Sequence, residues 1–495
     1  MTVSVGIDDI AIHIPRLYFD IKDFAEFRGA DYGKLNRGLG LSAMAIPDVH
    51  EDTATMGANA VARIIDRNKL EPTKIGRIYL GTESALDGSK PTATYIVDMT
   101  FACIGAVDAM HNTLDWVARG GVEKDRIGVV VFADNAKYDL GSSGEYTQGA
   151  GGGAILIRHN PRLLEIPDIW GVSTMPVHDF FKPRREITRK SIIETVLELA
   201  SDAGEKFKTN LSERIMRIID KTDKRDHTLF ESETLKVHKD TPVFDGAFSN
   251  RCYSESVKQA FINFRSKAIA HGRYDPNDDD ILTEQWSRII VHLPYAFQAK
   301  RMFPDVFRHD RRHLPTWSEI EAEIGPEPMR SDYPEGEPGE SEFEAANDAY
   351  RRKISKTNQF KEFVEQRIEK TQRASSKVGN QYTGSIFLAL MSALESDLED
   401  NQDMNGTRVG LCGYGSGAKA KVFEGVIQPD WKHIVSRFSL FARIDERQSI
   451  DKSVYEALHR GSKDSSVISP SAEFALVSIG AEGHLEGERR YSWVN

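Results

Sequence analysis

Four apolar runs in the sequence end on a residue that can take part in covalent chemistry. The reactive residues are Glu83, Cys103, His292 and Ser416, and the runs that lead to them are IGRIYLGTES, VDMTFAC, RIIVHLP and RVGLCGYGSG. Each run is short, rich in β-branched residues and bounded by Gly or Pro, which predicts a buried strand. Open α/β sheets build active sites from the loops beyond their strand ends, because a rigid scaffold holds those loops. The pattern predicts an α/β fold, and a carboxylate, a thiol and an imidazole so placed indicate covalent acyl chemistry.

Charge and composition exclude several classes of function. The 495 residues include 64 basic and 75 acidic side chains, and a net charge of -11 argues against a general nucleic-acid-binding surface. Cys103, Cys252 and Cys412 lie far apart and form no CxxC motif, so neither a disulfide framework nor a zinc knuckle is expected. The N-terminal sequence does not resemble a signal peptide, and no long apolar run occurs. We therefore expect a cytoplasmic protein without a nucleic-acid or membrane partner.

Strand-like runs alternate with helical patterns in two groups, as in βα units. The first group runs from VSVGIDDIAI to GGAILI, and the second comprises RIIVHLPYAF, RVGLCGYGSG and FALVSIG. Helices are predicted over 55–67, 113–120, 254–270 and 385–398. Residues 319–348 contain 11 acidic residues, one basic residue and four prolines. That composition predicts a solvated insertion or loop, which we place at about 316–350.

Cys103 and Glu83 each allow a catalytic and a structural interpretation. Cys103 stands where a strand gives way to an amphipathic helix, and a helix N-terminus stabilises a thiolate. The alternative is an inert core cysteine. Glu83 follows a strand, where partial burial suits a general acid or base. Its alternative is an N-cap interaction with the following KPTATY segment.

His292, Asn380 and Ser416 are further candidates. The His292 imidazole ends the apolar run RIIVHLP, where it needs a partner. It could donate to a substrate carbonyl or share a proton with a thiol. A satisfied structural histidine is the alternative. Asn380 precedes a long helical pattern and could simply cap it. The glycines around Ser416 would let a backbone N–H approach a ligand oxyanion closely, and Ser416 itself is not in a nucleophile elbow.

The order of the motifs is more specific than any one of them. It runs GTESALD, FACIGAVDA, DNAKYDLGSSGEYTQGAGGGA, HDFFKP, VFDGAFSNRCY, VHLPYAF, GNQYTGS and GYGSGA. This succession resembles the 3-hydroxy-3-methylglutaryl-coenzyme A synthases across nearly the whole chain. The resemblance implies a thiolase-like fold, in which two similar α/β halves form a five-layered body, and a homodimer. We place the halves at 1–185 and 186–495, with Glu83 and Cys103 in the first and His292, Asn380 and Ser416 in the second.

The resemblance also implies a condensation of acetyl-CoA with acetoacetyl-CoA in the mevalonate pathway. Cys103 would carry the acetyl group as a thioester, and Glu83 would then remove a proton from its methyl group. His292 would polarise the ketone of acetoacetyl-CoA, and Asn380 would hydrogen-bond to the same substrate. Backbone N–H groups of Cys103 and Ser416 would form the oxyanion hole. No metal or cofactor is implied, because the coenzyme A thioesters are themselves the substrates.

One further position matches the family and two depart from it. Tyr138, in the DNAKYDL motif, is implied to be a partner of the catalytic groups. Tyr146 stands where the family commonly has proline, and Phe297 stands where relatives often have a lysine near coenzyme A phosphates. Lys300 and Arg301 could supply the missing charge, or could simply lie on a solvated helix face.

Only 19 residues separate Glu83 from Cys103, fewer than the resemblance implies. A reversal between layers needs a loop of several residues, so we expect an interruption of the chain between about 96 and 101. If the short segment is the chain's own, one alternative gains weight, a catalytically inactive thiolase-fold scaffold. A second alternative, independent of this segment, is a polyketide β-branching synthase that takes a carrier-bound acceptor.

Overall fold

The computed structural model describes residues 4–93, 96–120, 126–199, 209, 211, 213, 234–275 and 281–495. These residues divide into two compact units. The larger unit comprises 1–179 and 245–495, and the smaller comprises 180–244. This division is not the one we predicted from sequence, and the proposed boundary between residues 185 and 186 stays a prediction.

A single mixed sheet runs through the larger unit. Its order is β14-β15-β16-β8-β1-β7-β6-β4-β5, and β9 pairs with β16 beside β8. The first group of strands comprises β1 (Val5–His13), β4 (Ile75–Gly81), β5 (Val97–Met99), β6 (Ile127–Ala136) and β7 (Gly149–His159). The second group comprises β9 (Gly171–Thr174), β14 (Trp286–Val291), β15 (Arg408–Gly415) and β16 (Lys419–Ile427). The short strand β8 (Leu164–Glu165) pairs with β1 and with β16, so it joins the two groups.

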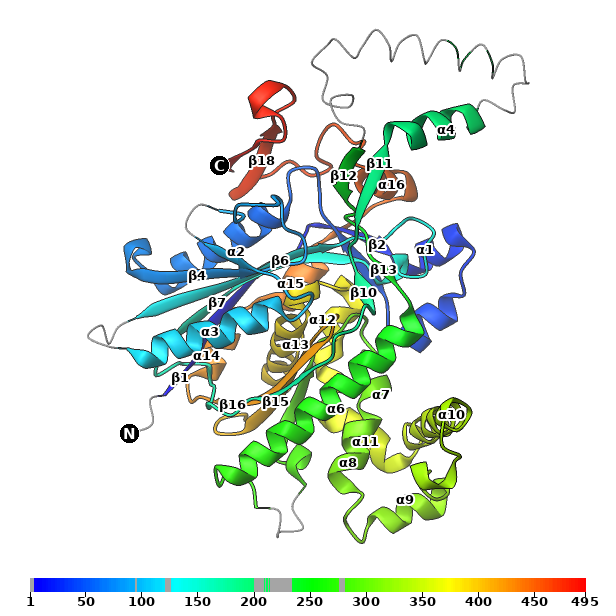
Figure 1. Ribbon diagram of the computed structural model, residues 1–495. Coiled ribbons are helices and arrows are strands. Elements are labelled where there is room, and N and C mark those ends of the chain that lie inside the picture. Colours follow the sequence, from blue (N-terminus) through cyan, green and yellow to red (C-terminus); the bar gives the residue numbers. More distant parts are fainter. Residues whose placement is uncertain are drawn as a thin grey trace. The chain divides into compact units, whose positions relative to one another are not determined.

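Helices cover both faces of each strand group and fill the space between the groups. Helix α2 (Thr53–Asn68) packs on the outer face of β1, β6 and β7, and α3 (Gly105–Arg119) packs on the opposite face (Figure 1). Helix α13 (Ser385–Glu399) lies in the same central layer, where the Phe387 ring stacks on Phe132 of β6 at 5.3 Å. Helix α6 (Gly246–Ala270) covers β9, β15 and β16 from outside. The expected five-layered α/β arrangement is confirmed.

The central layer is tight because glycines let strands approach α3 closely. An added Cβ at Gly81 of β4 would lie 2.2 Å from the Ala106 backbone nitrogen. On the other side of α3, an added Cβ at Gly415 of β15 would lie 2.9 Å from the Ile104 nitrogen. Both strand ends therefore press against the first turn of α3, which is where the Cys103 thiol lies.

Local sequence signals explain the helix boundaries. Helix α2 begins with a capping box, in which the Asp52 side chain accepts from Thr55 N and the Thr55 hydroxyl accepts from Asp52 N. Helix α6 begins at Gly246 after Asp245, whose side chain accepts from Phe248 N. The four helices expected from sequence are all present, with α3 beginning eight residues before the predicted stretch and α6 also beginning eight residues earlier than predicted.

The expected interruption before Cys103 is wrong. Residues 96–101 are continuous, and β5 pairs in parallel with β4 from Val97 to Met99. The described part of the β4–β5 connection forms turns rather than a helix, and Asp98 Oδ2 accepts hydrogen bonds from Thr92. The short spacing therefore belongs to the chain itself, and an irregular loop replaces a longer crossover.

The acidic stretch is more ordered than a loop. It contains α9 (Trp317–Ile324) and most of α10 (Glu337–Ile354). Buried Trp317, Ile320 and Tyr350 anchor these helices to the core, and Arg351 pairs with Asp305 at 3.2 Å. The acidic side chains lie on the outer faces of helices whose inner faces are apolar, which composition alone does not reveal.

Helices α7 (Gln298–Met302), α8 (Pro304–Arg311), α11 (Asn358–Arg367) and α12 (Glu369–Val378) complete this part of the unit. A small sheet of β2 (Leu17–Asp20), β3 (Ala43–Ile46) and β17 (Gln448–Ser449) packs beside α1 (Ile21–Arg28) and α16 (Lys452–Arg460). Helices α14 (Trp431–Val435) and α15 (Leu440–Asp445) connect β16 to this sheet.

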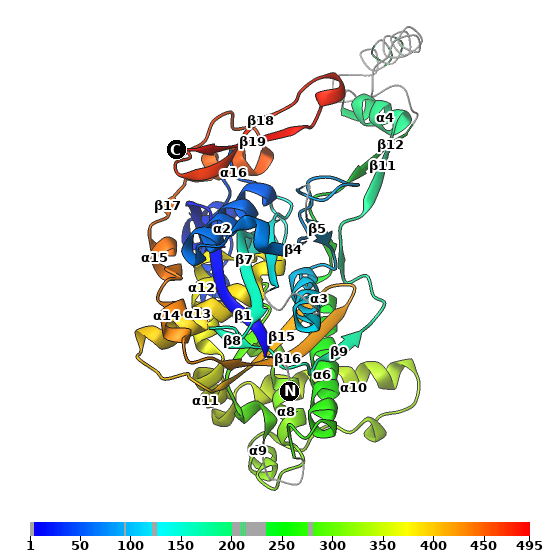
Figure 2. The same cartoon turned by 90° about the vertical axis from the view of Figure 1, so that its left-hand side faces the viewer.

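The FALVSIG run does not join the main sheet. It forms β18 (Glu473–Ile479), which pairs with β19 (Arg489–Val494) in a separate two-stranded sheet and packs against α2 (Figure 2). The smaller unit contains two short antiparallel pairs, β10 (Phe180–Phe181) with β13 (Val243–Phe244) and β11 (Arg184–Thr188) with β12 (Thr234–His238), together with α4 (Arg189–Leu199). In the part of the chain that the structure describes, no helix is long and apolar enough to cross a membrane.

Candidate active site

Cys103 occupies a strained turn at the start of α3. The residue before it, Ala102, has a φ of 42°, a left-handed conformation that non-glycine residues rarely adopt. Two backbone hydrogen bonds hold the turn, from Ile104 N to Phe101 O and from Gly105 N to Ala102 O, both 3.2 Å long. The thiol is buried and lies at the start of α3, where the helix dipole stabilises negative charge.

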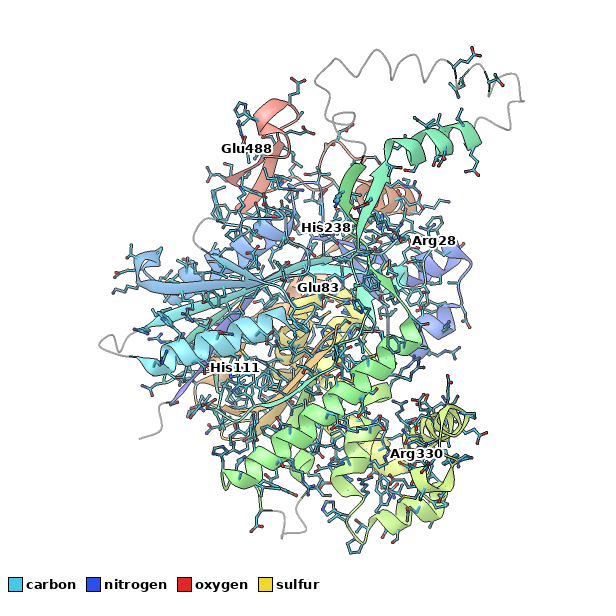
Figure 3. The ribbon with its side chains drawn as sticks, in the orientation of Figure 1. Arg28, Glu83, His111, His238, Arg330 and Glu488 are labelled. Atoms are coloured by element: carbon cyan, nitrogen blue, oxygen red, sulfur yellow. The ribbon has the colours of Figure 1, made fainter. Side chains whose placement is uncertain are left out.

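Glu83 contacts the thiol directly. The Cys103 Sγ donates a hydrogen bond to Glu83 Oε1 at 2.8 Å. Glu83 lies just beyond the end of β4 and is half-buried, in the interior of the unit rather than at its periphery (Figure 3). In the KPTATY segment, Thr92 N donates to Asp98 Oδ2, so this segment has a carboxylate partner within the same loop. The structure thus brings the two residues that the sequence proposed as nucleophile and base together.

Asp134, at the end of β6, fixes the Glu83 backbone. Asp134 Oδ1 accepts from Glu83 N at 2.7 Å and from Thr82 Oγ1 at 3.0 Å. Its other oxygen accepts from Thr383, both from the backbone N at 3.1 Å and from Oγ1 at 2.5 Å. Complete burial raises the pKa of Asp134, and these hydrogen bonds partly offset the shift. Asp134 belongs to the DNAKYDL motif, but its role was not predicted from the sequence.

Tyr138 lies next to the catalytic pair. Burial raises the pKa of its phenol, and the nearby Cys103 and Glu83 raise it further, while hydrogen bonds with Thr147 and Asn380 act in the opposite direction. The phenol is therefore protonated at neutral pH and can donate a hydrogen bond. The structure places Tyr138 where the sequence analysis expected a partner of the catalytic groups.

Tyr382 is a site residue that the sequence analysis did not find. Its ring centroid lies 6.4 Å from that of Tyr138, and burial raises its pKa together with the nearby Tyr138, Glu83 and Cys103. Its φ is 42°, a second left-handed non-glycine residue at the site. Tyr382 belongs to the GNQYTGS motif, in which only Asn380 was predicted to be a site residue.

Asn380 holds the turn before α13 with its side chain. Asn380 Oδ1 accepts from Tyr382 N at 2.8 Å and from Ser385 Oγ at 3.0 Å, and its backbone N donates to Thr147 O at 3.0 Å. This is close to the capping alternative considered from sequence. Its contact with the Tyr138 phenol also connects Asn380 to the catalytic pair. A role in binding substrate stays a prediction.

His292 is buried at the end of β14 without the partner that the sequence analysis expected. Neither ring nitrogen has a hydrogen-bond partner among the described residues, although the ring is almost completely buried. Desolvation lowers the pKa of His292 to about 3, so the imidazole is neutral at physiological pH. The backbone is well held, since His292 N donates to Cys412 O and Tyr253 Oη donates to His292 O. A neutral imidazole with a free N–H is suited to donate to a carbonyl oxygen.

The Ser416 turn lies against the nucleophile turn. An added Cβ at Gly415 would lie 2.6 Å from Phe101 O. Asp179, which is fully buried, accepts from Gly417 N and from Tyr414 Oη, both at 2.8 Å, and so fixes both sides of Ser416. The glycine-rich loop therefore brings backbone atoms close to Cys103. The sequence predicted that this loop contributes to the site through its backbone.

Lys300 and Arg301 both stack on aromatic rings. Lys300 Nζ lies 4.0 Å from the centroid of Phe297, and the Arg301 guanidinium lies 5.5 Å from that of Tyr295. Lys300 is half-buried and Arg301 is exposed. The aromatic residue at 297 therefore supports a cation three residues later in α7.

One cluster of described residues has the spacing of a cation site. Ligand atoms of His111, Asp115 and Asp168 lie within 4.8 Å of one another. However, Lys421 Nζ lies 2.8 Å from His111 Nδ1, so a positively charged side chain already lies beside these ligand atoms. His111 is on α3, but the cluster includes none of the residues around Cys103.

Comparisons with known proteins agree with this geometry. The family model described as hydroxymethylglutaryl-coenzyme A synthase N terminal matches residues 1–161, and the C-terminal model of the same family matches residues 235–464. The chain belongs to the hydroxymethylglutaryl-coenzyme A synthase family. The two matches include Glu83, Cys103, His292, Asn380 and Ser416.

Curated hydroxymethylglutaryl-CoA synthases resemble the chain over almost its whole length. The enzyme of Haloferax volcanii is 29% identical over 99% of this chain and 99% of its own. The enzyme of Saccharomyces cerevisiae is 26% identical over 92% of this chain and 81% of its own. Among solved structures, MvaS in complex with 3-hydroxy-3-methylglutaryl coenzyme A is 26% identical, with a TM-score of 0.75 and complete coverage of both chains. The thiolase-like fold of the hydroxymethylglutaryl-coenzyme A synthase family is therefore the fold of this chain.

Proposed function

We propose that the chain condenses acetyl-CoA with acetoacetyl-CoA to give 3-hydroxy-3-methylglutaryl-CoA, through an acetyl group on Cys103, as a step of the mevalonate pathway. The observation that carries the proposal is the 2.8 Å contact between the Cys103 thiol and the Glu83 carboxylate. Family membership and the HMG-CoA bound to the structural neighbour MvaS give independent support. The enzyme is then an acyltransferase.

In the first step, Glu83 takes the thiol proton and the Cys103 sulfur attacks the carbonyl carbon of acetyl-CoA. The new C–S bond forms as the bond to coenzyme A breaks, and coenzyme A leaves with the proton. The helix N-terminus and the backbone N–H groups of Cys103 and Ser416 stabilise the oxyanion. Preorganised donors of this kind are worth about 2.7–4 kcal/mol each in acyl transfer.

In the second step, the Glu83 carboxylate removes a proton from the acetyl methyl group. The resulting carbon nucleophile attacks the ketone carbon of acetoacetyl-CoA, and the alkoxide takes a proton back from the Glu83 carboxylic acid. Water then hydrolyses the thioester to Cys103 and releases the product. One carboxylate can serve both steps because it lies beside the sulfur that carries the acetyl group.

Residues of the second strand group and of the helices around it hold the acceptor, acetoacetyl-CoA. The neutral His292 imidazole donates to the ketone oxygen, and Asn380 hydrogen-bonds to the same substrate. Lys300 and Arg301, which lie five and six residues beyond Tyr295, supply positive charge for the coenzyme A phosphates in place of the lysine absent at Phe297. The chain's own side chains and backbone groups supply the nucleophile, the base and the oxyanion donors, so the proposal requires no metal or other cofactor.

The decisive experiment is product analysis by mass spectrometry with purified protein, acetyl-CoA and acetoacetyl-CoA. We expect 3-hydroxy-3-methylglutaryl-CoA with the wild-type chain and none with Cys103→Ala. A parallel reaction with an acceptor bound to a carrier protein tests the polyketide alternative. Product only from the carrier-bound acceptor would reassign the substrate, and no product from either would favour the inactive scaffold.

We also propose a homodimer that forms along β5. This strand is the last of the main sheet, and one side of its backbone pairs with no other strand that the structure describes. Val97 is 52% exposed and Phe101 is 36% exposed beside this edge. A second copy would pair with the edge and cover both side chains, and Val97→Asp should shift the solution mass measured by light scattering towards the monomer. The three cysteines are buried and form no disulfide, which supports the proposed cytoplasmic location.

A further inference from the structure

Side chains hold both backbone polar groups of Tyr138. Tyr138 N donates to Gln148 Oε1 at 2.9 Å, and Tyr138 O lies 2.8 Å from His459 Nε2. Because a carbonyl oxygen only accepts hydrogen bonds, His459 Nε2 must carry the proton. The two bonds fix the peptide planes on either side of Tyr138. They therefore fix the direction in which its side chain leaves the backbone.

The hydrogen bonds continue from Gln148 into helix α16. Gln148 Nε2 donates to Tyr455 Oη at 2.7 Å, and Tyr455 Oη donates to Glu145 Oε1 at 2.9 Å. Arg28 binds the same carboxylate through Nε at 3.0 Å and through its terminal nitrogen at 2.6 Å. Gln148, Tyr455 and Glu145 are all buried. A buried network of this kind is rigid, because each broken bond would leave a buried polar group unsatisfied.

The direction of each bond in this network is determined. The Glu145 carboxylate can only accept, so the Tyr455 hydroxyl must donate to it and must accept from the Gln148 amide. Burial raises the pKa of Tyr455 and keeps that hydroxyl protonated. The Gln148 oxygen is then left to face Tyr138 N, as observed. Replacing Tyr455 by Phe would leave the Gln148 amide without its acceptor and free it to rotate.

We propose that Tyr455 and His459 are positioning residues for the condensation. From helix α16 they set the backbone of Tyr138, whose phenol contacts Asn380 and lies beside Cys103 and Glu83. Neither residue reaches the reacting atoms. The proposal rests on the proposed function, because it assigns Asn380 to the acetoacetyl-CoA acceptor.

The size of the effect follows from what each substitution removes. His459→Leu and Tyr455→Phe each remove hydrogen bonds from a network that acts on the site through one residue. Loss of a neutral hydrogen bond changes an equilibrium by about fivefold. We expect kcat/KM for acetoacetyl-CoA to fall about five- to tenfold in each variant, with acetylation of Cys103 by acetyl-CoA changed by less than about twofold. His459→Gln keeps an N–H donor and should recover most of the loss.

A double-mutant cycle separates positioning from general stability. If His459 acts through the Tyr138 phenol, His459→Leu should have no further effect on kcat/KM in a Tyr138→Phe background. Arg460→Gln is the matched control, because Arg460 is exposed on the same helix and pairs with Glu456 one turn earlier. We expect that control to match the wild type.

Two results would overturn the inference while leaving the proposed function intact. One is unchanged kcat/KM in both single variants of a wild type that forms product. The other is a full additional loss from His459→Leu when the phenol is already absent. If the wild type forms no product, the proposed function fails. The positioning role is then decided by titrating acetoacetyl-CoA into Cys103→Ala protein, where His459→Leu should weaken binding about fivefold and equal binding would overturn it.

Discussion

Cys103 Sγ and Glu83 Oε1 lie 2.8 Å apart, although the two residues come from different strand ends. Gly81 of β4 and the first turn of α3 touch, and this contact brings the carboxylate to the sulfur. At this distance the same carboxylate can accept the thiol proton and, after acetylation, a proton of the acetyl methyl group. The two residues therefore form a nucleophile and a base in direct contact.

We predict that Glu83→Gln separates the two chemical steps. Glutamine keeps the size of the side chain and can still accept from the thiol, but it cannot take up a proton from carbon. Acetyl-CoA should still acetylate Cys103, more slowly, while condensation should fall by at least about 100-fold. Single-turnover kinetics with each substrate in turn would measure the two rates. Asp87→Asn, four residues further along and fully exposed, should behave as the wild type, and a Glu83→Gln enzyme that condenses normally would remove Glu83 from the mechanism.

We predict that Gly415→Ala disrupts the nucleophile turn. The added methyl group would lie 2.6 Å from Phe101 O and 2.8 Å from a methyl carbon of Ile104, and neither neighbour can move without moving Cys103. Acetylation of Cys103 should fall by about tenfold or more. Gly413→Ala is the control on the same strand, because its nearest neighbour would be a Val107 methyl at 3.3 Å. Equal acetylation rates in the two variants would show that the Gly415 approach does not matter.

We predict that Asp134→Asn misplaces Glu83. The aspartate accepts hydrogen bonds on both oxygens, whereas asparagine would turn an N–H group towards the donors of either Glu83 or Thr383. A mismatched buried polar group costs about 1–3 kcal/mol, so condensation should fall by about 5- to 150-fold and the unfolding midpoint in urea should also fall. Thr383→Val removes only one hydroxyl donor and should have the smaller effect. A normal rate in Asp134→Asn would mean that Glu83 is positioned by other contacts.

We predict that His292 makes the protein sensitive to acid. Its pKa is lowered to about 3 by burial, so between that value and about 6.5 the unfolded chain binds a proton that the folded chain does not. Above pH 6.5, titration of His292 does not reduce the free energy of unfolding. Below pH 6.5 this free energy falls as the pH decreases, by up to about 1.4 kcal/mol per pH unit. Urea unfolding at several pH values should show a weaker dependence in His292→Gln than in the wild type. Identical slopes between pH 6 and pH 4.5 would contradict the buried, neutral imidazole.

The sequence predicted the parts of the site that follow strand ends. Glu83, Cys103 and His292 each follow an apolar run, and the structure places each beyond a strand of the main sheet. The five layers and the helices around them also followed from alternating patterns and ordered motifs. These signals are local, so they survive in a single sequence.

Features that depend on distant contacts could not be predicted. The role of Asp134 arises from four hydrogen bonds to two separate segments, and the position of Tyr382 depends on a left-handed turn. The acidic stretch resembled a loop in composition, but it is helical because Trp317 and Tyr350 are buried against the core. The interruption expected before Cys103 was wrong because a β strand of only three residues suffices to bring the chain back to the sheet edge.

The most direct test of the account is the intact mass of the protein after mixing with acetyl-CoA alone. We predict that one acetyl group is added to the wild type, that peptide mapping places it on Cys103, and that Cys103→Ala gains none. The same measurement on Cys252→Ala and Cys412→Ala should show acetylation as in the wild type. An unmodified wild type, or an acetyl group on Cys252 or Cys412, would contradict the central claim that Cys103 is the nucleophile.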